Sequence, residues 1–154
     1  EPRGFTWVIS GRLAVSERVG GYGFQHRRVR REEEISWLKI AGVNAVLSLL
    51  PGNQNLAAYA AAGLNAHHEP LLELEPAGAE RVFATLRALL RDRKTVLLLH
   101  RDTVDDAVAG ILAGYLVYSG LLEDPIKATA LIQEILRRPL GPEARAIIPQ
   151  AAGA

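Results

Sequence analysis

The hydrophobic positions of this chain fall into short continuous runs that alternate with longer segments of helical spacing. The short runs are typical of buried strands and predict strands at 7–9, 43–50, 64–70 and 95–99. Helical spacing, bounded by Gly, Pro or Asp, predicts helices at 31–40, 56–62, 77–92, 106–118, 126–138 and 142–148. This alternation, without internal repeats, predicts an α/β fold with a mostly parallel sheet, in which 7–9 is an edge strand and 95–99 the central strand.

Length and composition set the class of protein. A chain of 154 residues with 49% hydrophobic content predicts a single domain spanning residues 1–154. The formal net charge of +1 argues against a protein that mainly binds nucleic acid or anionic membranes. No apolar run approaches the roughly twenty residues that cross a bilayer, and the first residues do not form a signal sequence. We therefore expect a cytoplasmic protein without a membrane partner.

The richest segment for function runs from residue 97 to residue 110. An apolar strand leads into His100, a tight loop and a long apolar helix, in which Gly110 and Gly114 allow close backbone contact. A strand, a tight loop and a helix amino end in this order are typical of a phosphate-binding loop.

This segment resembles the signature HCxxGxxR of the cysteine-dependent protein tyrosine and dual-specificity phosphatases, in which a thiolate attacks phosphorus and the arginine holds the phosphate. His100 is kept, but Arg101 stands at the nucleophile position, Val104 at the glycine and Ala107 at the arginine. The resemblance extends over nearly the whole chain, through the segments 7–14, 42–50 and 68–76, and is similar to small bacterial phosphatases of the cyclin-dependent kinase inhibitor-3 type. It implies a three-layer phosphatase-type fold and brings Glu73 nearest to the place of the general acid.

The loop thus has the form of a degenerate phosphatase signature. Its positions are His100, Arg101, Asp102, Thr103, Val104, Asp105, Asp106 and Ala107. Cysteine is absent from all 154 residues, so no thiolate nucleophile, disulfide or cysteine-ligated zinc is available. Carboxylates on the loop repel phosphate, and valine disfavours the left-handed backbone that glycine permits. We favour the interpretation that the three aspartates cap the following helix and neutralise Arg101.

Four arginines form a basic cluster directly before a predicted acidic helix start. Arg27, Arg28, Arg30 and Arg31 precede three glutamates at 32–34, which we expect in the first helical turns. Arginines in this number can bind a phosphorylated or acidic partner through bidentate contacts. The alternative, a solvated loop whose arginines pair with these glutamates, is slightly favoured.

A second polar cluster contains histidine and glutamate. His67, His68, Glu69 and Glu73 are residue types that bind zinc or transfer protons. Adjacent strand residues face opposite sides of a sheet, however, so only one of the two histidines enters a given pocket. A structural or surface role is favoured, and we expect neither a metal nor a cofactor.

The sequence therefore predicts a catalytically inactive phosphatase-like protein that acts as a binding or regulatory module, with a protein partner or a phosphorylated or anionic ligand. One alternative is an enzyme of a different hydrolytic reaction that uses His100, Asp102 and Glu73, with or without a metal. Another is a phosphoanion-binding module that uses Arg101 or the cluster at 27–31.

Overall fold

The computed structural model describes residues 1–154, except for the side chain of Gln25. The chain forms two compact units, one of residues 1–70 with 92–104 and one of residues 71–91 with 105–154. The first unit contains a five-stranded sheet of order β1-β2-β5-β3-β4. Its strands are β1 (Thr6–Ile9), β2 (Leu13–Ser16), β3 (Ala45–Ser48), β4 (Asn65–His68) and β5 (Leu97–His100). All strand pairs are parallel except β1 with β2. The prediction of a single domain stays a prediction.

The sheet confirms the predicted edge and central strands and adds one strand. β1 lies at the edge and β5 in the middle, as the apolar pattern indicated. β2 was not predicted as a separate strand, because its four residues are too few to show a period and follow β1 closely. All four are buried, since β2 pairs with β1 on one side and β5 on the other.

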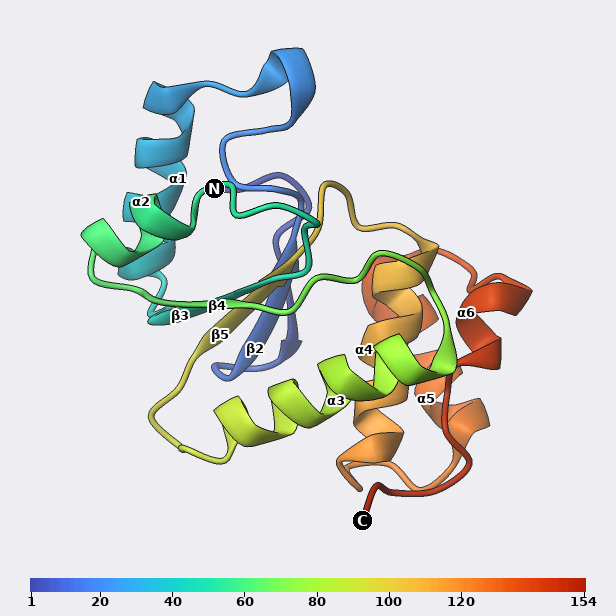
Figure 1. The fold of residues 1–154 in the computed structure, drawn as a ribbon. Coiled ribbons are helices and arrows are strands. Elements are labelled where there is room, and N and C mark those ends of the chain that lie inside the picture. Colours follow the sequence, from blue (N-terminus) through green and yellow to red (C-terminus); the bar gives the residue numbers. More distant parts are fainter. The chain divides into compact units, whose positions relative to one another are not determined.

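Helices α1 (Arg28–Ile40) and α2 (Leu56–Ala61) pack on the sheet of this unit, as Figure 1 shows, and a short 3-10 turn, η1 (Gly23–Gln25), precedes α1. The core between them contains sheet residues of β2, β3 and β5 together with Ile35, Leu38 and Tyr59. Helix α1 starts three residues earlier than predicted. The three glutamates therefore lie in its second turn rather than in its first, which contains no acidic residue, and this is within the predicted first turns. A tertiary contact explains the start, since the Arg27 amide donates to the carbonyl of Gly20 (N···O 3.0 Å).

The second unit is helical, with α3 (Pro76–Leu90), α4 (Asp106–Tyr118), α5 (Pro125–Leu136) and α6 (Pro142–Ala146). Helix α4 has the predicted bounds, is buried from Val108 to Tyr118 and packs against the other three helices (Figure 1). The predicted close contacts at its glycines are confirmed. A Cβ at Gly110 would come within 2.9 Å of the Ala144 Cα, and one at Gly114 would overlap the ring of Phe83. Among the residues that the structure describes, every helix is too short or too polar to span a bilayer.

Candidate functional site: a polar row and the loop after β5

A row of polar residues ends the parallel strands of the first unit. In the sheet register His100 lies between Ser16 of β2 and Ser48 of β3, and Ser48 is opposite His68 of β4. Register partners in parallel strands place their side chains on the same face. Ser16, Ser48 and His100 are fully buried. The row occupies the carboxyl ends of the strands, which is where open α/β sheets bind ligands.

Both ring nitrogens of His100 are used inside the protein. Nδ1 lies 3.1 Å from the carbonyl oxygen of Arg101, and Nε2 lies 3.0 Å from the hydroxyl of Tyr59. A carbonyl oxygen only accepts, so Nδ1 carries the proton and Nε2 accepts the Tyr59 hydroxyl. Burial, supported by the nearby Arg18 cation, lowers the pKa of His100 to about 4. Burial also raises the pKa of Tyr59, so both groups are neutral near pH 7.

Asn55 extends this network towards the loop that follows β2. Its Nδ2 donates to the carbonyl of Val19 at 2.8 Å and lies 3.5 Å from the Tyr59 hydroxyl, while its Oδ1 accepts from Arg31 Nη1 at 3.3 Å. Asn55 is buried and has a φ of 67°, a left-handed conformation that asparagine tolerates better than most residues. An asparagine before a helix predicts an N-cap, but here no side-chain cap bond forms.

Backbone amides of the loop after β2, residues 18–21, form hydrogen bonds to two other segments of the chain. The amide of Arg18 donates to the carbonyl of Asp102 at 3.1 Å, and the amide of Gly20 donates to the buried carboxylate of Glu34 at 2.9 Å. Gly20 has a φ of 83°, and a Cβ there would come within 2.8 Å of the Arg31 Cβ. Arg30 Nε completes the anchor by donating to Glu34 Oε2 at 2.7 Å. This loop therefore places Arg18 beside the segment at 101–104, which follows β5.

The three aspartates of the segment that follows β5 have separate partners. Asp105 caps α4 by accepting from the Val108 amide at 3.0 Å, which confirms the capping interpretation for this residue. Asp106 accepts from the Gly141 amide at 2.7 Å and lies 3.9 Å from Arg138 Nη2. Asp102, which is 53% exposed, lies 3.6 Å from Nη1 of Arg18. Two of the three carboxylates thus have arginine partners other than the predicted Arg101.

No residue of the same loop has a left-handed backbone. Outside glycine, the residues with positive φ in the described chain are Asn55 and Arg137. Val104 is therefore not left-handed, and its Cγ2 lies 3.5 Å from where a Cβ on Gly4 would stand. Thr103 and Ala107 are half-buried.

The residues of the predicted histidine and glutamate cluster belong to two different units. His68 is half-buried, and its Nε2 donates to the carbonyl of Leu50 at 2.7 Å. His67 is paired with Leu47, one residue earlier in the register, and so faces the other side of the sheet. Glu69 follows β4 in the same unit, whereas Glu73 belongs to the other unit. Among the described residues, no group of three or more histidine, aspartate or glutamate side chains is arranged to hold a metal ion.

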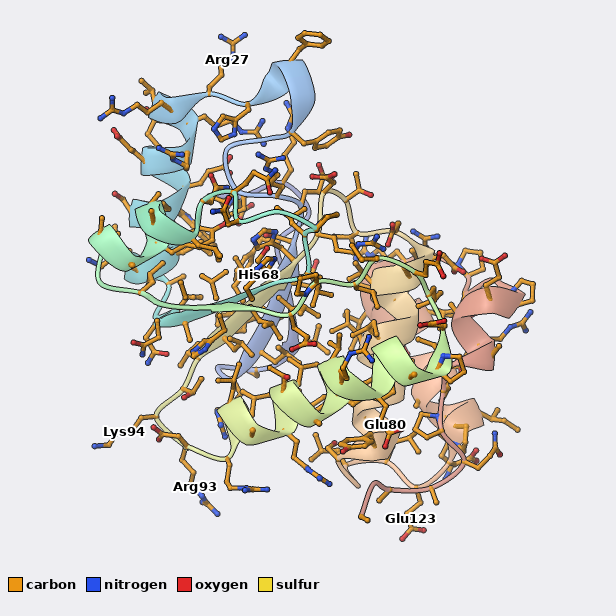
Figure 2. All side chains as sticks on the ribbon, viewed as in Figure 1. Arg27, His68, Glu80, Arg93, Lys94 and Glu123 are labelled. Atoms are coloured by element: carbon orange, nitrogen blue, oxygen red, sulfur yellow. The ribbon has the colours of Figure 1, made fainter. Side chains whose placement is uncertain are left out.

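The structure divides the predicted arginine cluster into four different environments. Arg30 is anchored on the buried Glu34, and Arg28 forms an exposed pair with Glu32 at 3.1 Å. Arg31 contacts Asn55, and Arg27 projects from the chain just before α1 (Figure 2). The alternative of pairing with the glutamates is confirmed for Arg28 and Arg30.

Several residues of this site were missed in the sequence. Arg18, Asn55 and Tyr59 all contact or approach the His100 loop, yet they come from segments more than forty positions away in the chain. The local sequence around Asn55 and Tyr59 gives no sign of a functional role. The only available signal was that Arg18 follows another charged residue and precedes two glycines, a sequence typical of a loop.

Comparisons with known proteins agree with this architecture. The fold matches kinase associated phosphatase carrying a serine at its catalytic cysteine, with a TM-score of 0.72, 16% identity and coverage of 96% of this chain and 93% of that one. It also matches human DUSP28, with a TM-score of 0.64, 18% identity and coverage of 96% and 92%. A third match is a putative phosphatase (DUF442) from Shewanella putrefaciens, with a TM-score of 0.65, 18% identity and coverage of 96% and 89%.

Sequence comparison identifies fewer related proteins than structural comparison does. No known family model matches the chain. A curated relative, the phosphonates import ATP-binding protein PhnC of Lactiplantibacillus plantarum, is 25% identical over 148 residues, which are 86% of this chain. The chain spans only 57% of the length of that relative. The structural matches confirm the predicted fold class: the chain has the α/β phosphatase-type fold, with a mostly parallel central sheet.

Proposed function

We propose that this chain is a phosphatase-fold protein without phosphatase activity, which works as a binding or regulatory module. The observation that carries the proposal is the residue set between β5 and α4. Arg101 follows His100 where the resembled enzymes carry their cysteine, and Ala107 stands in the first turn of α4 where they carry their arginine. Cysteine phosphatase chemistry needs a thiolate to attack phosphorus and a fixed cation to hold the phosphate oxygens. Neither residue is present at its position.

The surroundings of the loop support a structural role for the residue that is kept. His100 has both nitrogens engaged and is fully buried, so it has no free nitrogen with which to move a proton to or from a substrate. This weighs against the alternative of a different hydrolytic reaction built on His100.

The name of the curated relative includes ATP binding, but this chain lacks the sequence of a nucleotide-binding loop. Such a loop, GxxxxGK[ST], requires a lysine directly after a glycine, and none of Lys39, Lys94 and Lys127 follows a glycine.

Restoring the nucleophile alone tests the proposal. We expect Arg101→Cys to hydrolyse p-nitrophenyl phosphate no faster than the parent, because Ala107 leaves the phosphate without its clamp and the loop carboxylates repel it. Released p-nitrophenol is followed by absorbance, with Arg101→Ser as the matched control. A burst of one product molecule per molecule of Arg101→Cys would show that the loop is still a working phosphate site.

A second candidate function, binding of a phosphate-like anion, is favoured by the state of Arg18. Its side chain is only 15% exposed, and its Nε is buried without a hydrogen-bond partner in the described part of the chain. Its carboxylate partner, Asp102, is at 3.6 Å, beyond the range of a direct charge-assisted hydrogen bond. We propose that Asp102 acts as an internal anion that is paired with Arg18. An external phosphate or sulfate then competes with Asp102 for this arginine and binds only weakly in the parent.

Sulfate should therefore stabilise Asp102→Asn more than the parent. At a hundredfold excess over its Kd, a ligand adds about 2.7 kcal/mol to the unfolding free energy, which raises the Tm by roughly 8 °C in a chain of this size. Thermal melts with sulfate and with chloride at matched ionic strength measure this gain, and Arg18→Gln in the Asp102→Asn background should remove it. Equal sulfate responses in the parent and in Asp102→Asn would contradict the internal-anion interpretation.

A further inference from the structure

A groove of about 500 Å³ runs between α1 and α2 in the first unit. One wall is formed by Arg28, Arg31, Glu32 and Ile35, whose spacing of three, four and seven residues places them on one face of α1. Ala58 and Ala61 of α2 line the opposite side. Because alanine side chains are small, the groove between these walls stays open, with apolar alanines on one wall and a largely polar, charged rim on the other.

Positive charge exceeds negative charge in the lining of this groove, where two of the three charged residues are arginines. Helix α1 begins with Arg28, its first turn contains no acidic residue, and the N-cap residue Arg27 makes no side-chain cap bond. Cations at this position oppose the helix dipole, which favours anions at a helix amino end. At the other end, Lys39 Nζ donates to the carbonyl of Ala62 at 2.6 Å. Glu32 is the acidic residue of the lining.

Both arginines of the rim can bind an anionic group of a ligand. Arg28 and Glu32 form a pair with side chains 82% and 60% exposed, and such exposed pairs contribute little to stability. Arg31 donates to the neutral Asn55 Oδ1 at 3.3 Å, its Nε has no partner, and no carboxylate of the described residues pairs with it. A ligand carboxylate at this rim therefore replaces a weak internal pair at Arg28 and adds a first anionic partner at Arg31.

We propose that the groove between α1 and α2 docks an acidic peptide segment of a protein partner. Carboxylates of the peptide bind Arg28 and Arg31, and a neighbouring apolar side chain of the peptide lies on the alanines. This inference rests on the proposed role of the chain as a binding module and supplies the chemistry of its partner. Charge complementarity with the two arginines of the lining selects an acidic segment over a neutral or basic one.

Fluorescence anisotropy with a fluorescein-labelled Asp-Glu-Leu-Asp-Glu-Leu peptide tests the proposal. We expect saturable binding to the parent, about tenfold weaker binding to Arg28→Gln, and tighter binding to Glu32→Gln, because the internal competitor is removed. Ala61→Leu should also weaken binding by filling the groove. The matched controls are Arg93→Gln, whose exposed side chain projects from another part of the unit (Figure 2), and Ala57→Leu, an exposed position of α2 outside the groove. Thermal melts establish that each variant is folded.

Three results would overturn the proposal. The first is no anisotropy change up to about 1 mM protein, the weak end of specific affinity. The second is equal binding by Arg28→Gln, Ala61→Leu and their controls. The third is binding of a dT oligonucleotide that exceeds peptide binding and is unaffected by Ala61→Leu, which would indicate a nucleic-acid surface. Hydrolysis of p-nitrophenyl phosphate is measured separately. A lack of peptide binding would therefore overturn the docking proposal without affecting the proposed lack of phosphatase activity. Conversely, phosphatase activity would overturn the proposed function without affecting a measured peptide affinity.

Discussion

Acidification from about pH 7.5 to about pH 5 should lower the unfolding free energy of this chain by about 2 kcal/mol through His100 alone. The pKa of His100 is lowered from 6.5 to about 4 in the folded protein, mainly by burial. Between these two values the unfolded chain binds a proton that the folded chain does not. The stabilisation from neutral His100 is therefore fully present above pH 6.5 and is lost as the pH falls towards 4.

Urea unfolding at several pH values measures this effect. The parent is compared with His100→Gln, which lacks the titrating ring but keeps a donor and an acceptor at the site. The other three histidines are common to both proteins, so the difference between the two pH profiles isolates His100. We expect the profile of His100→Gln to be flatter between about pH 6.5 and about pH 4. Parallel profiles would show that His100 is protonated in the folded state, contrary to its buried position.

Replacement of Glu34 should have the other large effect. Glu34→Ala removes the acceptor of the Gly20 amide and the partner of Arg30, and Glu34 is only 6% exposed. Breaking a buried, hydrogen-bonded ion pair by removing one partner costs about 3 kcal/mol, at the low end of the usual range because Arg30 is partly exposed. The same change releases the loop that carries Arg18.

The exposed neighbour Glu33 provides the control for this change. Glu33→Ala should alter the unfolding free energy by less than about 0.5 kcal/mol, as is usual for surface substitutions. Urea unfolding at neutral pH measures all three proteins. A loss in Glu34→Ala no larger than that in Glu33→Ala would show that the loop at 18–21 does not depend on this carboxylate.

Much of the fold could be predicted from the sequence because its strongest signals are local. Helix α4 is almost wholly apolar and begins at a capping aspartate, so its bounds were found, and the apolar run before His100 identified the central strand. The start of α1 was misplaced because the bond from the Arg27 amide to Gly20 lies outside the helix pattern. Tertiary contacts of this kind override local preference.

The candidate site was predictable only in part. The loop from His100 to Ala107 was located by its resemblance to a known signature, and the capping role of Asp105 followed from the preference of aspartate for helix starts. The partners of the loop could not be foreseen. Arg18 meets Asp102 across 84 positions of sequence, and Tyr59 meets His100 across 41. These contacts depend on which strands become neighbours in the sheet, and residue patterns along the chain do not encode that directly.

The most direct test of the proposed lack of phosphatase activity is phosphate release from a phosphotyrosine peptide by the purified parent protein. We predict no release above the rate of the buffer, because the chain has neither the thiolate nor the arginine at the positions where the resembled enzymes use them. Turnover that survives repurification and disappears in Asp102→Ala or Glu73→Ala would contradict the proposal and assign the loop a different chemistry.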